Sequence, residues 1–391
     1  MALSTKVTSF NTGVGAAGTT IDVTLGFQPE FFILWWSGRT ETTDTVGRAD
    51  SHIGSGFGFN DTNRGCVAWS RGNALSAEDG ASVARTDGII FRMTIPGVAN
   101  GALDVSAKAS WPADGIRFVV DTQFGASMRI HGLFVGGTDI TNTGFGTIAP
   151  SATVCANTDI TSLAFQPDIV FFLQNYDSTT INLITAIEGT LAFGAAISSA
   201  KQAINAIMFD VAAPSGDCGQ YCFDGLEVAG RMSGATPTAI SSRYDFVQML
   251  SNGFRVHTNE QFSAETVLWL AVKGGKWDMG NLLTQTDTTT DITGSPALSG
   301  QTPKAIIFSS ACRAESTQDA GTTPSRWSMG AATSATEEAG MAEHGEQGSA
   351  NTRVGTAVEH DACYVNLANI ASDGAAQTIQ GSMHVTATAA T

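Results

Sequence analysis

The amino-acid sequence predicts an all-β fold made of three tandem antiparallel β-sandwich domains that are related by an internal repeat. One observation is a proline-led apolar segment that occurs three times at nearly equal spacing. A second is that runs of aromatic and β-branched residues alternate with turns rich in Gly, Asn and Ser. A third is the low charged fraction of 14%. Long charged side chains favour helices, and this chain has short polar residues in their place.

The repeat is marked first by its prolines. Pro29, Pro167 and Pro303 each precede an apolar run, and they are 138 and 136 residues apart (167 − 29 and 303 − 167). Glycines of two further markers keep the offset of 138, at Gly115 and Gly253 and at Gly137 and Gly275. This unit is too long for a solenoid repeat and has the size of a domain. We therefore expect domains at 1–137, 138–275 and 276–391, as beads in tandem or as three lobes around a pseudo-threefold axis.

The third copy is expected to lack its last hairpin. Pro29 and Gly115 are 86 residues apart (115 − 29), and 86 residues after Pro303 is position 389, near the last residue, Thr391. The counterpart of Gly115–Gly137 would then be absent, which leaves a sheet edge or an apolar face uncovered. Either the sequence is truncated, or another chain or segment completes the domain by strand addition.

Within each copy, the run after the proline predicts a central strand, since it is apolar on both faces. The turns Asp114-Gly115 and Asn252-Gly253 predict two-residue hairpins. Further strands are expected at Thr19–Leu25, Gly88–Ile95, Cys363–Ile370 and Ser382–Thr388. Ala200–Phe209 and Ala331–Met341 have helical potential but a Gly-rich counterpart in the first copy, so they are expected to be loops or short helical turns. The region Arg39–Thr86 and its equivalents vary most between copies, as partner-contacting loops do.

Composition argues against several functions. The chain has 20 Lys and Arg against 36 Asp and Glu, a net charge of −16, which opposes binding to nucleic acid or an anionic membrane. The longest apolar run, Phe31–Trp36, is too short to span a bilayer. The N-terminal residues MALSTKVTSF do not form a secretory signal. The six cysteines share no pattern between copies and are expected to be reduced, as in a cytosol: Cys66, Cys155, Cys218, Cys222, Cys312 and Cys363.

Two short motifs suggest binding chemistry but are better explained by structure. Gly13, Gly15 and Gly18 form G-x-G-x-x-G, yet a strand follows them where a phosphate site needs a helix N-terminus. They are interpreted as a glycine turn. Cys218 and Cys222 have C-x3-C spacing, but zinc needs two more ligands. We interpret them as an incidental pair, with a disulfide as the alternative in an oxidising setting.

Acidic and histidine residues gather towards the C-terminus. Carboxylates and imidazoles can hold a cation, but a solvated loop is the preferred interpretation. The stretch comprises Glu337, Glu338, Glu343, His344, Glu346, Glu359, His360 and Asp361. Asp287 and Asp291 are likewise expected to be plain surface. No catalytic, cofactor-binding or metal-binding residue is therefore predicted.

Nucleophilic catalysis has no support, because there is no G-x-S-x-G elbow and the histidines do not recur at equivalent positions. These are His52, His131, His257, His344, His360 and His384. The tryptophans are expected to pack in cores and interfaces rather than stack on sugars: Trp35, Trp36, Trp69, Trp111, Trp269, Trp277 and Trp327. Trp35 and Trp36 are adjacent and should face opposite sides of one strand.

The FQP-type strands, the DG/NG-F-x-V hairpins and the closing Gly-Gly strand resemble tandem-repeat virion structural proteins of tailed bacteriophages, across all three copies. The resemblance implies head-decoration, tail or fibre proteins that are made in the host cytoplasm and assembled into the virion. It transfers no functional residue.

The sequence thus favours a non-enzymatic structural component of a phage virion, a capsid-surface decoration or tail accessory protein. Its expected partners are other virion proteins and further copies of itself, with no nucleic acid, no membrane and no cofactor. The first alternative is a glycan- or receptor-binding adhesin on a fibre or cell surface, which predicts exposed aromatic residues and a host glycan as ligand. A third possibility is a polysaccharide depolymerase, which predicts paired carboxylates in a groove.

Overall fold

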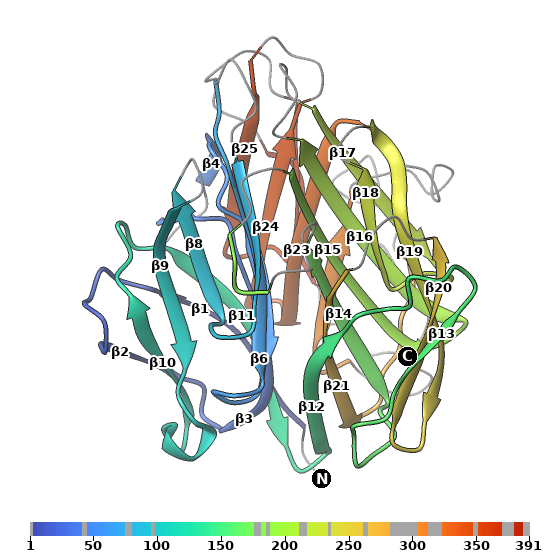
Figure 1. The fold of residues 1–391 in the computed structure, drawn as a ribbon. Helices are drawn as coiled ribbons and strands as arrows, with labels where there is room; N and C mark the ends of the chain where they lie inside the picture. The colour runs from blue at the N-terminus through green and yellow to red at the C-terminus, as the bar shows by residue number, and fades with distance from the viewer. Residues whose placement is uncertain are drawn as a thin grey trace.

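Strands dominate the structure, as the sequence predicts. The computed structural model describes residues 3–40, 45–74, 80–94, 98–175, 181–184, 188–210, 217–233, 236–260, 265–281, 303–311, 323–346, 351–369 and 379–385. Within these residues there is one 3-10 turn, η1 (Lys108–Ser110), and no α-helix. All the sheets pair antiparallel strands (Figure 1), so the all-β prediction is confirmed. The boundaries of the three domains stay a prediction, and residues 1–137, 138–275 and 276–391 are called the first, second and third segments below.

The first segment contributes two sheets. The large sheet has the order β1-β11-β3-β5-β6-β7, and the small sheet has the order β2-β10-β9-β8. The strands of these sheets are β1 (Leu3–Asn11), β2 (Thr20–Thr24), β3 (Pro29–Trp36), β5 (Gly54–Gly58), β6 (Arg64–Arg71), β7 (Gly80–Arg85), β8 (Ile90–Thr94), β9 (Val98–Val105), β10 (Gly115–Thr122) and β11 (Arg129–Gly137).

The second segment matches the first strand for strand. Its large sheet has the order β12-β21-β14-β15-β16-β17, and its small sheet has the order β13-β20-β19-β18. The strands are β12 (Ile140–Ile148), β13 (Asn157–Ile160), β14 (Ile169–Asn175), β15 (Glu188–Ser198), β16 (Lys201–Asp210), β17 (Asp217–Asp224), β18 (Ala229–Ser233), β19 (Thr236–Leu250), β20 (Gly253–Glu260) and β21 (Val267–Gly274).

In the part of the chain that the structure describes, the third segment has fewer strands than the other two. Its large sheet has the order β22-β23-β24-β25-β4, in which β4 (Thr45–Ala49) comes from the first segment, and its small sheet is the pair β26-β27. The remaining strands are β22 (Ile306–Ser310), β23 (Ser325–Ser334), β24 (Glu337–Gly345), β25 (Val354–Glu359), β26 (Tyr364–Leu367) and β27 (Ile379–Met383). Strand addition therefore occurs within the chain, at the β25 edge.

In the first two segments the central strand of the large sheet is buried on both faces because it is apolar at consecutive positions. In β3, Phe31 and Trp35 belong to one core cluster, whereas Phe32 and Trp36 belong to another, as expected for side chains that alternate across a strand. The cluster with Trp35 also contains residues of the second and third segments, such as Phe209, and is called the shared core below. Three large sheets thus enclose one core, and the segments are not separate beads.

Clusters of a second kind lie between a large sheet and its small sheet. In the first segment, Phe32 of β3 packs with Phe118 of β10, their ring centroids 6.2 Å apart. In the second, Phe172 of β14 packs with Phe254 of β20, their ring centroids 5.8 Å apart. In the third, the cluster is small and includes Val365 of β26.

One close approach recurs in all three segments. A Cβ atom added to the glycine at the middle of β5, β15 or β23 would lie only 2.7, 1.9 or 2.2 Å from a backbone carbonyl oxygen. The glycines and carbonyls are Gly56 and Ile89, Gly194 and Val228, and Gly330 and Cys363. The glycines are 138 and 136 residues apart (194 − 56 and 330 − 194), the same spacings as the prolines. Glycine is required here because the small sheet's first strand begins against the large sheet.

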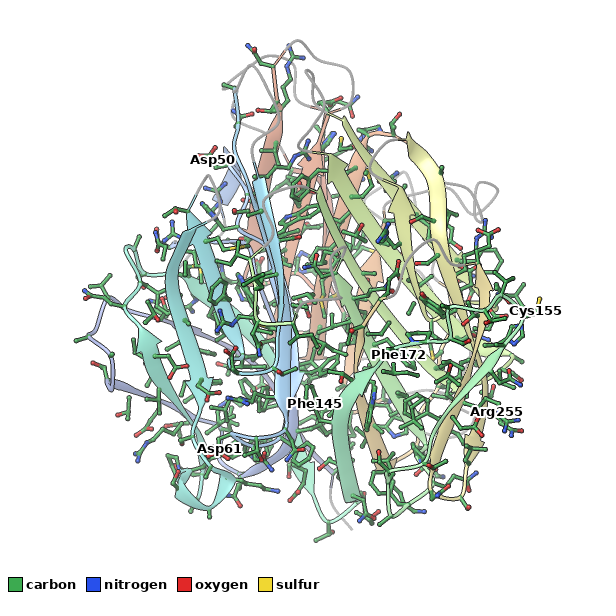
Figure 2. All side chains as sticks on the ribbon, viewed as in Figure 1. Asp50, Asp61, Phe145, Cys155, Phe172 and Arg255 are labelled. Atoms are coloured by element: carbon green, nitrogen blue, oxygen red, sulfur yellow. The ribbon has the colours of Figure 1, made fainter. Side chains whose placement is uncertain are left out.

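The first strand of a segment also crosses the large sheet of another. β1 contacts β23 and β24, and Thr5 Oγ1 donates to the carbonyl oxygen of Lys304 at 2.7 Å. β12 lies beside the first segment, where the rings of Phe145 and Phe57 are 6.1 Å apart (Figure 2 labels Phe145 between the two segments). Trp277, which follows β21, packs 6.0 Å from Phe171 of β14. These overlaps join the segments around the shared core.

Two expectations about local structure are wrong. Ala200–Phe209 lies almost entirely in β16, and Ala331–Met341 lies in β23 and β24, because a sheet buried on both faces accepts the alanines that suggest a helix. Asp114-Gly115 does not close a two-residue hairpin, since η1 lengthens the connection between β9 and β10. In the second segment Leu250 pairs with Gly253, and a two-residue turn joins β19 to β20. The strands expected near Thr19–Leu25, Gly88–Ile95 and Cys363–Ile370 correspond to β2, β8 and β26. The strand expected at Ser382–Thr388 overlaps only the end of β27, since residues 384 and 385 are not in a strand and 386–388 lie outside the described residues.

Candidate functional site: the seam between the three segments

A buried ion pair joins the first and third segments. Arg71 is the last residue of β6, and Glu343 lies in β24, which occupies the corresponding place in the third sheet. Arg71 Nη1 is 3.7 Å from Glu343 Oε1, and both side chains are 0% exposed. Because charges taken out of water are tolerated only when they are paired, this contact makes the docking of the two segments specific.

The second segment closes over this ion pair. The centroid of the Phe209 ring of β16 lies 5.6 Å from Arg71 Cζ, a cation–π distance. The ring centroids of Phe209 and Trp69 are 4.7 Å apart in an edge-to-face arrangement. Cys218 Sγ donates to the carbonyl oxygen of Gly345 at 3.0 Å. The ends of β6, β16 and β24, one strand from each segment, therefore meet at one point.

A pair of histidines forms a second contact between the first and third segments. The ring of His131 in β11 lies 5.3 Å from that of His360, which follows β25. Ser9 Oγ is 2.7 Å from His131 Nδ1, and Trp35 stacks at 6.3 Å. Burial, with the nearby charges of His360 and Arg129, holds the pKa of His131 well below its usual value. The imidazole is therefore neutral, and acid opposes this contact.

The side chain of Asn205 takes the place of a strand beside β22. In the other two segments the strand next to β3 or β14 is β11 or β21. Here Asn205 of β16 donates from Nδ2 to the carbonyl oxygen of Ser309 at 3.0 Å and accepts the N–H of Ala311 at 3.1 Å. One amide thus supplies the donor and the acceptor that a neighbouring strand would supply.

A polar network links the large and small sheets of the second segment. Glu265 Oε2 accepts hydrogen bonds from Gln174 at 2.5 Å, Ser242 at 2.7 Å and Tyr244 at 3.0 Å, and Arg231 Nη1 lies 3.3 Å from Oε1. Burial raises the pKa of Glu265. The Glu265 side chain is 0% exposed, so the network braces the sandwich rather than facing a substrate.

Carboxyl groups also gather in the first segment. Burial, then the charges of Asp104 and Asp87, raises the pKa of Asp121 to about 6. Asp104 accepts from Arg64 through both oxygens at 2.7 Å, which holds it as an ion pair. The matching residues of the second segment are Asp245 and Asn259, which are hydrogen-bonded at 2.5 Å.

An ion pair on the outer face of the small sheets recurs in the first two segments. Arg117 of β10 contacts Asp22 of β2 through 2.6 and 2.8 Å hydrogen bonds. Arg255 of β20 contacts Asp159 of β13 through 2.5 and 2.7 Å hydrogen bonds (Figure 2 labels Arg255 at the molecule's outer edge). The offsets of 138 and 137 residues (255 − 117 and 159 − 22) are the sequence signal that could have revealed both pairs.

The structure places the two short motifs differently: Cys218 contributes to the seam through its hydrogen bond to Gly345, and the glycines form a turn. Gly13, Gly15 and Gly18 lie between β1 and β2, with positive φ at Gly13 and Gly18, and a strand follows them. Cys218 and Cys222 both lie in β17. Four residues along a strand span about 13 Å, too far for a disulfide between them.

The interpretation of the acidic and histidine-bearing stretch as a solvated loop is wrong for its central part. Glu338, Glu343 and His344 lie in β24 and are buried. His344 Nε2 lies 3.2 Å from Glu346 Oε1. The repeat could have shown this, since β24 corresponds to β6, an interior strand. Asp287 and Asp291 lie outside the described residues.

None of the seven tryptophans is exposed: six are buried, and Trp277 is half-buried. Trp35 and Trp36 face opposite sides of β3, as predicted. The exposed large apolar side chains of the described residues are Val14, Val154, Leu183 and Leu226, and none is aromatic.

Within the described part of the chain, no group of three or more His, Cys, Asp or Glu side chains is placed to hold a metal ion. No helix in that part is long and apolar enough to cross a membrane. A scan against protein-family models finds no match, and a search of the curated proteins finds none either.

Proposed function

We propose that this chain consists of three copies of one antiparallel sandwich module around a shared core. We propose also that it serves as a non-enzymatic structural component of a phage virion. The matching strand orders of the first two segments support the repeat, and so does the glycine contact that recurs in all three. The role is that of a capsid-surface decoration or tail accessory protein.

The shared core is the observation that carries the proposal. It combines residues of all three segments, so the three segments pack together in one chain as the subunits of a trimer would. A rigid body with three related lobes suits a site where symmetry-related subunits meet. Low charge density on its surfaces lowers the desolvation cost of packing against neighbours.

The buried charged groups of the seam are consistent with this role. Arg71 and Glu343 are sealed from solvent, where they direct how the segments dock and cannot reach a substrate. The proposed partners are other virion proteins and further copies of this chain, assembled in the host cytoplasm, with no nucleic acid or membrane. A host glycan is the ligand expected only under the adhesin alternative.

The proposal is tested on particles purified from the source by density gradient, with an antibody raised against the chain. We expect the chain to remain with intact particles, to be labelled at symmetric positions by electron microscopy, and to be present in many copies by quantitative mass spectrometry. Absence from washed particles contradicts the proposal. A few copies at a fibre tip, with binding on a glycan array, instead favour an adhesin, and release of reducing sugar ends favours a depolymerase.

A further inference from the structure

The small sheet of the third segment is two strands narrower than its counterparts. In the first segment β10 lies between β2 and β9, and in the second β20 lies between β13 and β19. Within the described residues, the third small sheet holds β26 and β27. Among the described residues, no strand pairs with the second edge of β27.

Two repeated contacts show that β27 stands where β9 and β19 stand. The residue at the start of the small sheet donates its N–H across the sheet at 2.9 Å in every segment, from Ile89 to Leu103, from Val228 to Tyr244 and from Cys363 to Met383. A side chain near the start of β6, β16 or β24 is also hydrogen-bonded to a residue one or two positions after this acceptor. The pairs are Arg64 with Asp104, Gln202 with Phe246, and Glu338 with Val385. Met383 therefore corresponds to Leu103 and Tyr244.

Burial differs at this matched position. Leu103 and Tyr244 are 0% and 1% exposed, whereas Met383 is only half-buried and the residues at 380–382 are exposed. In the first two segments the next strand, β10 or β20, covers this edge. The exposure of β27 is what is expected of an edge that no such strand covers.

The large sheet of the third segment is also partly exposed, at the strand that corresponds to β3 and β14. Ala305 and Ile307 pack on the shared core, so Ile306 and Phe308 point to the opposite face, where they are partly exposed. Leu34 and Phe172, which precede Phe308 by the repeat spacings, are 0% and 1% exposed. Those two residues are covered by the apolar faces of β10 and β20.

We propose that the edge of β27, together with Ile306 and Phe308, binds an extended segment of a separate polypeptide that pairs with β27 as β10 pairs with β9. β10 and β20 define the chemistry of the occupant, since every second side chain is apolar and buried: Ile116, Phe118 and Val120 in one, Phe254 and Val256 in the other. Both of these strands are already engaged in their own sheets, so neither of them is the occupant. Such strand addition combines main-chain hydrogen bonds with side-chain specificity.

The test uses the full chain and a fluorescein-labelled peptide that copies residues 114–122. We expect saturable binding by fluorescence anisotropy. Binding should weaken about tenfold or more when Ile116, Phe118 and Val120 of the peptide are changed to Ser, and about as much when the protein carries Phe308→Ser, since each change removes buried apolar anchors. Leu226→Ser is the matched control, because Leu226 is 57% exposed on another segment, and it should leave binding unchanged.

Hydrogen exchange gives an independent readout. We expect residues 379–383 to exchange rapidly in the chain alone and to become protected when the peptide binds. Slow exchange of 379–383 without peptide, absence of binding, or binding that Phe308→Ser does not weaken would each overturn the proposal. The inference specifies one contact of the proposed packing role but rests on the third segment's geometry, so it can hold even if the chain is absent from virus particles.

Discussion

The buried pair of Arg71 and Glu343 gives the sharpest prediction about stability. Replacing Glu343 by Gln leaves the arginine charge buried at the seam, where both side chains are 0% exposed. Loss of one partner of a buried pair costs about 3–5 kcal/mol, so Glu343→Gln and Arg71→Met should each lower the free energy of unfolding by that amount. The double variant Arg71→Met, Glu343→Met should recover most of the loss, because apolar residues of similar volume can replace both charges.

The assay is urea unfolding followed by circular dichroism, with unchanged m-values as the check that only stability has changed. Arg117→Met is the matched control. Its partner Asp22 lies on the surface, and the Arg117 and Asp22 side chains are 36% and 44% exposed, so solvent screens the pair and the change should cost far less stability than Glu343→Gln. A loss below about 1 kcal/mol for Glu343→Gln, or a double variant as unstable as the sum of the single variants, would refute this account of the seam.

Two further predictions concern packing and protonation. Gly194→Ala should destabilise the chain by about 1–3 kcal/mol, as overpacking does, because the new Cβ would lie 1.9 Å from the Val228 carbonyl oxygen. Gly381→Ala is the control and should be neutral, because its Cβ meets no atom within 4 Å. Equal unfolding midpoints for the two variants would contradict the close approach. Burial, then the charges of Arg92 and Arg39, lowers the pKa of His52 to about 4. Since the unfolded chain takes up a proton below about pH 6.5 and the folded chain does not, the stability from His52 is present above that pH and falls by up to about 3 kcal/mol as the pH drops to 4. His52→Gln should flatten this part of the pH dependence of urea unfolding, and an unchanged profile would show that His52 is not responsible.

The sequence revealed those parts of the fold that depend on local pattern and on the repeat. The runs after Pro29 and Pro167 predicted central strands, and the adjacency of Trp35 and Trp36 predicted that they face opposite sides. Both predictions rest on the twofold alternation of a strand, which the sequence carries directly. Composition likewise predicted an all-β chain.

The seam could not be predicted in the same way, because it joins residues whose only connection is through tertiary structure. Glu343 and His344 are charged or polar and were assigned to a surface loop, yet they lie in an interior strand, where Glu343 pairs with Arg71 of the first segment and His344 contacts the carbonyl oxygen of Ala368. Asn205 beside β22 and the pairing of β4 with β25 are also contacts between copies. A repeat offset shows which positions are alike, but it does not show which copies touch.

Differential scanning calorimetry of the whole chain tests the central claim most directly. If the three segments enclose one core, heating should melt them together, with a single transition and a ratio of calorimetric to van't Hoff enthalpy of about 1. Separate transitions, or a ratio approaching about 3, would mean that each segment unfolds by itself and that no common core holds the molecule together.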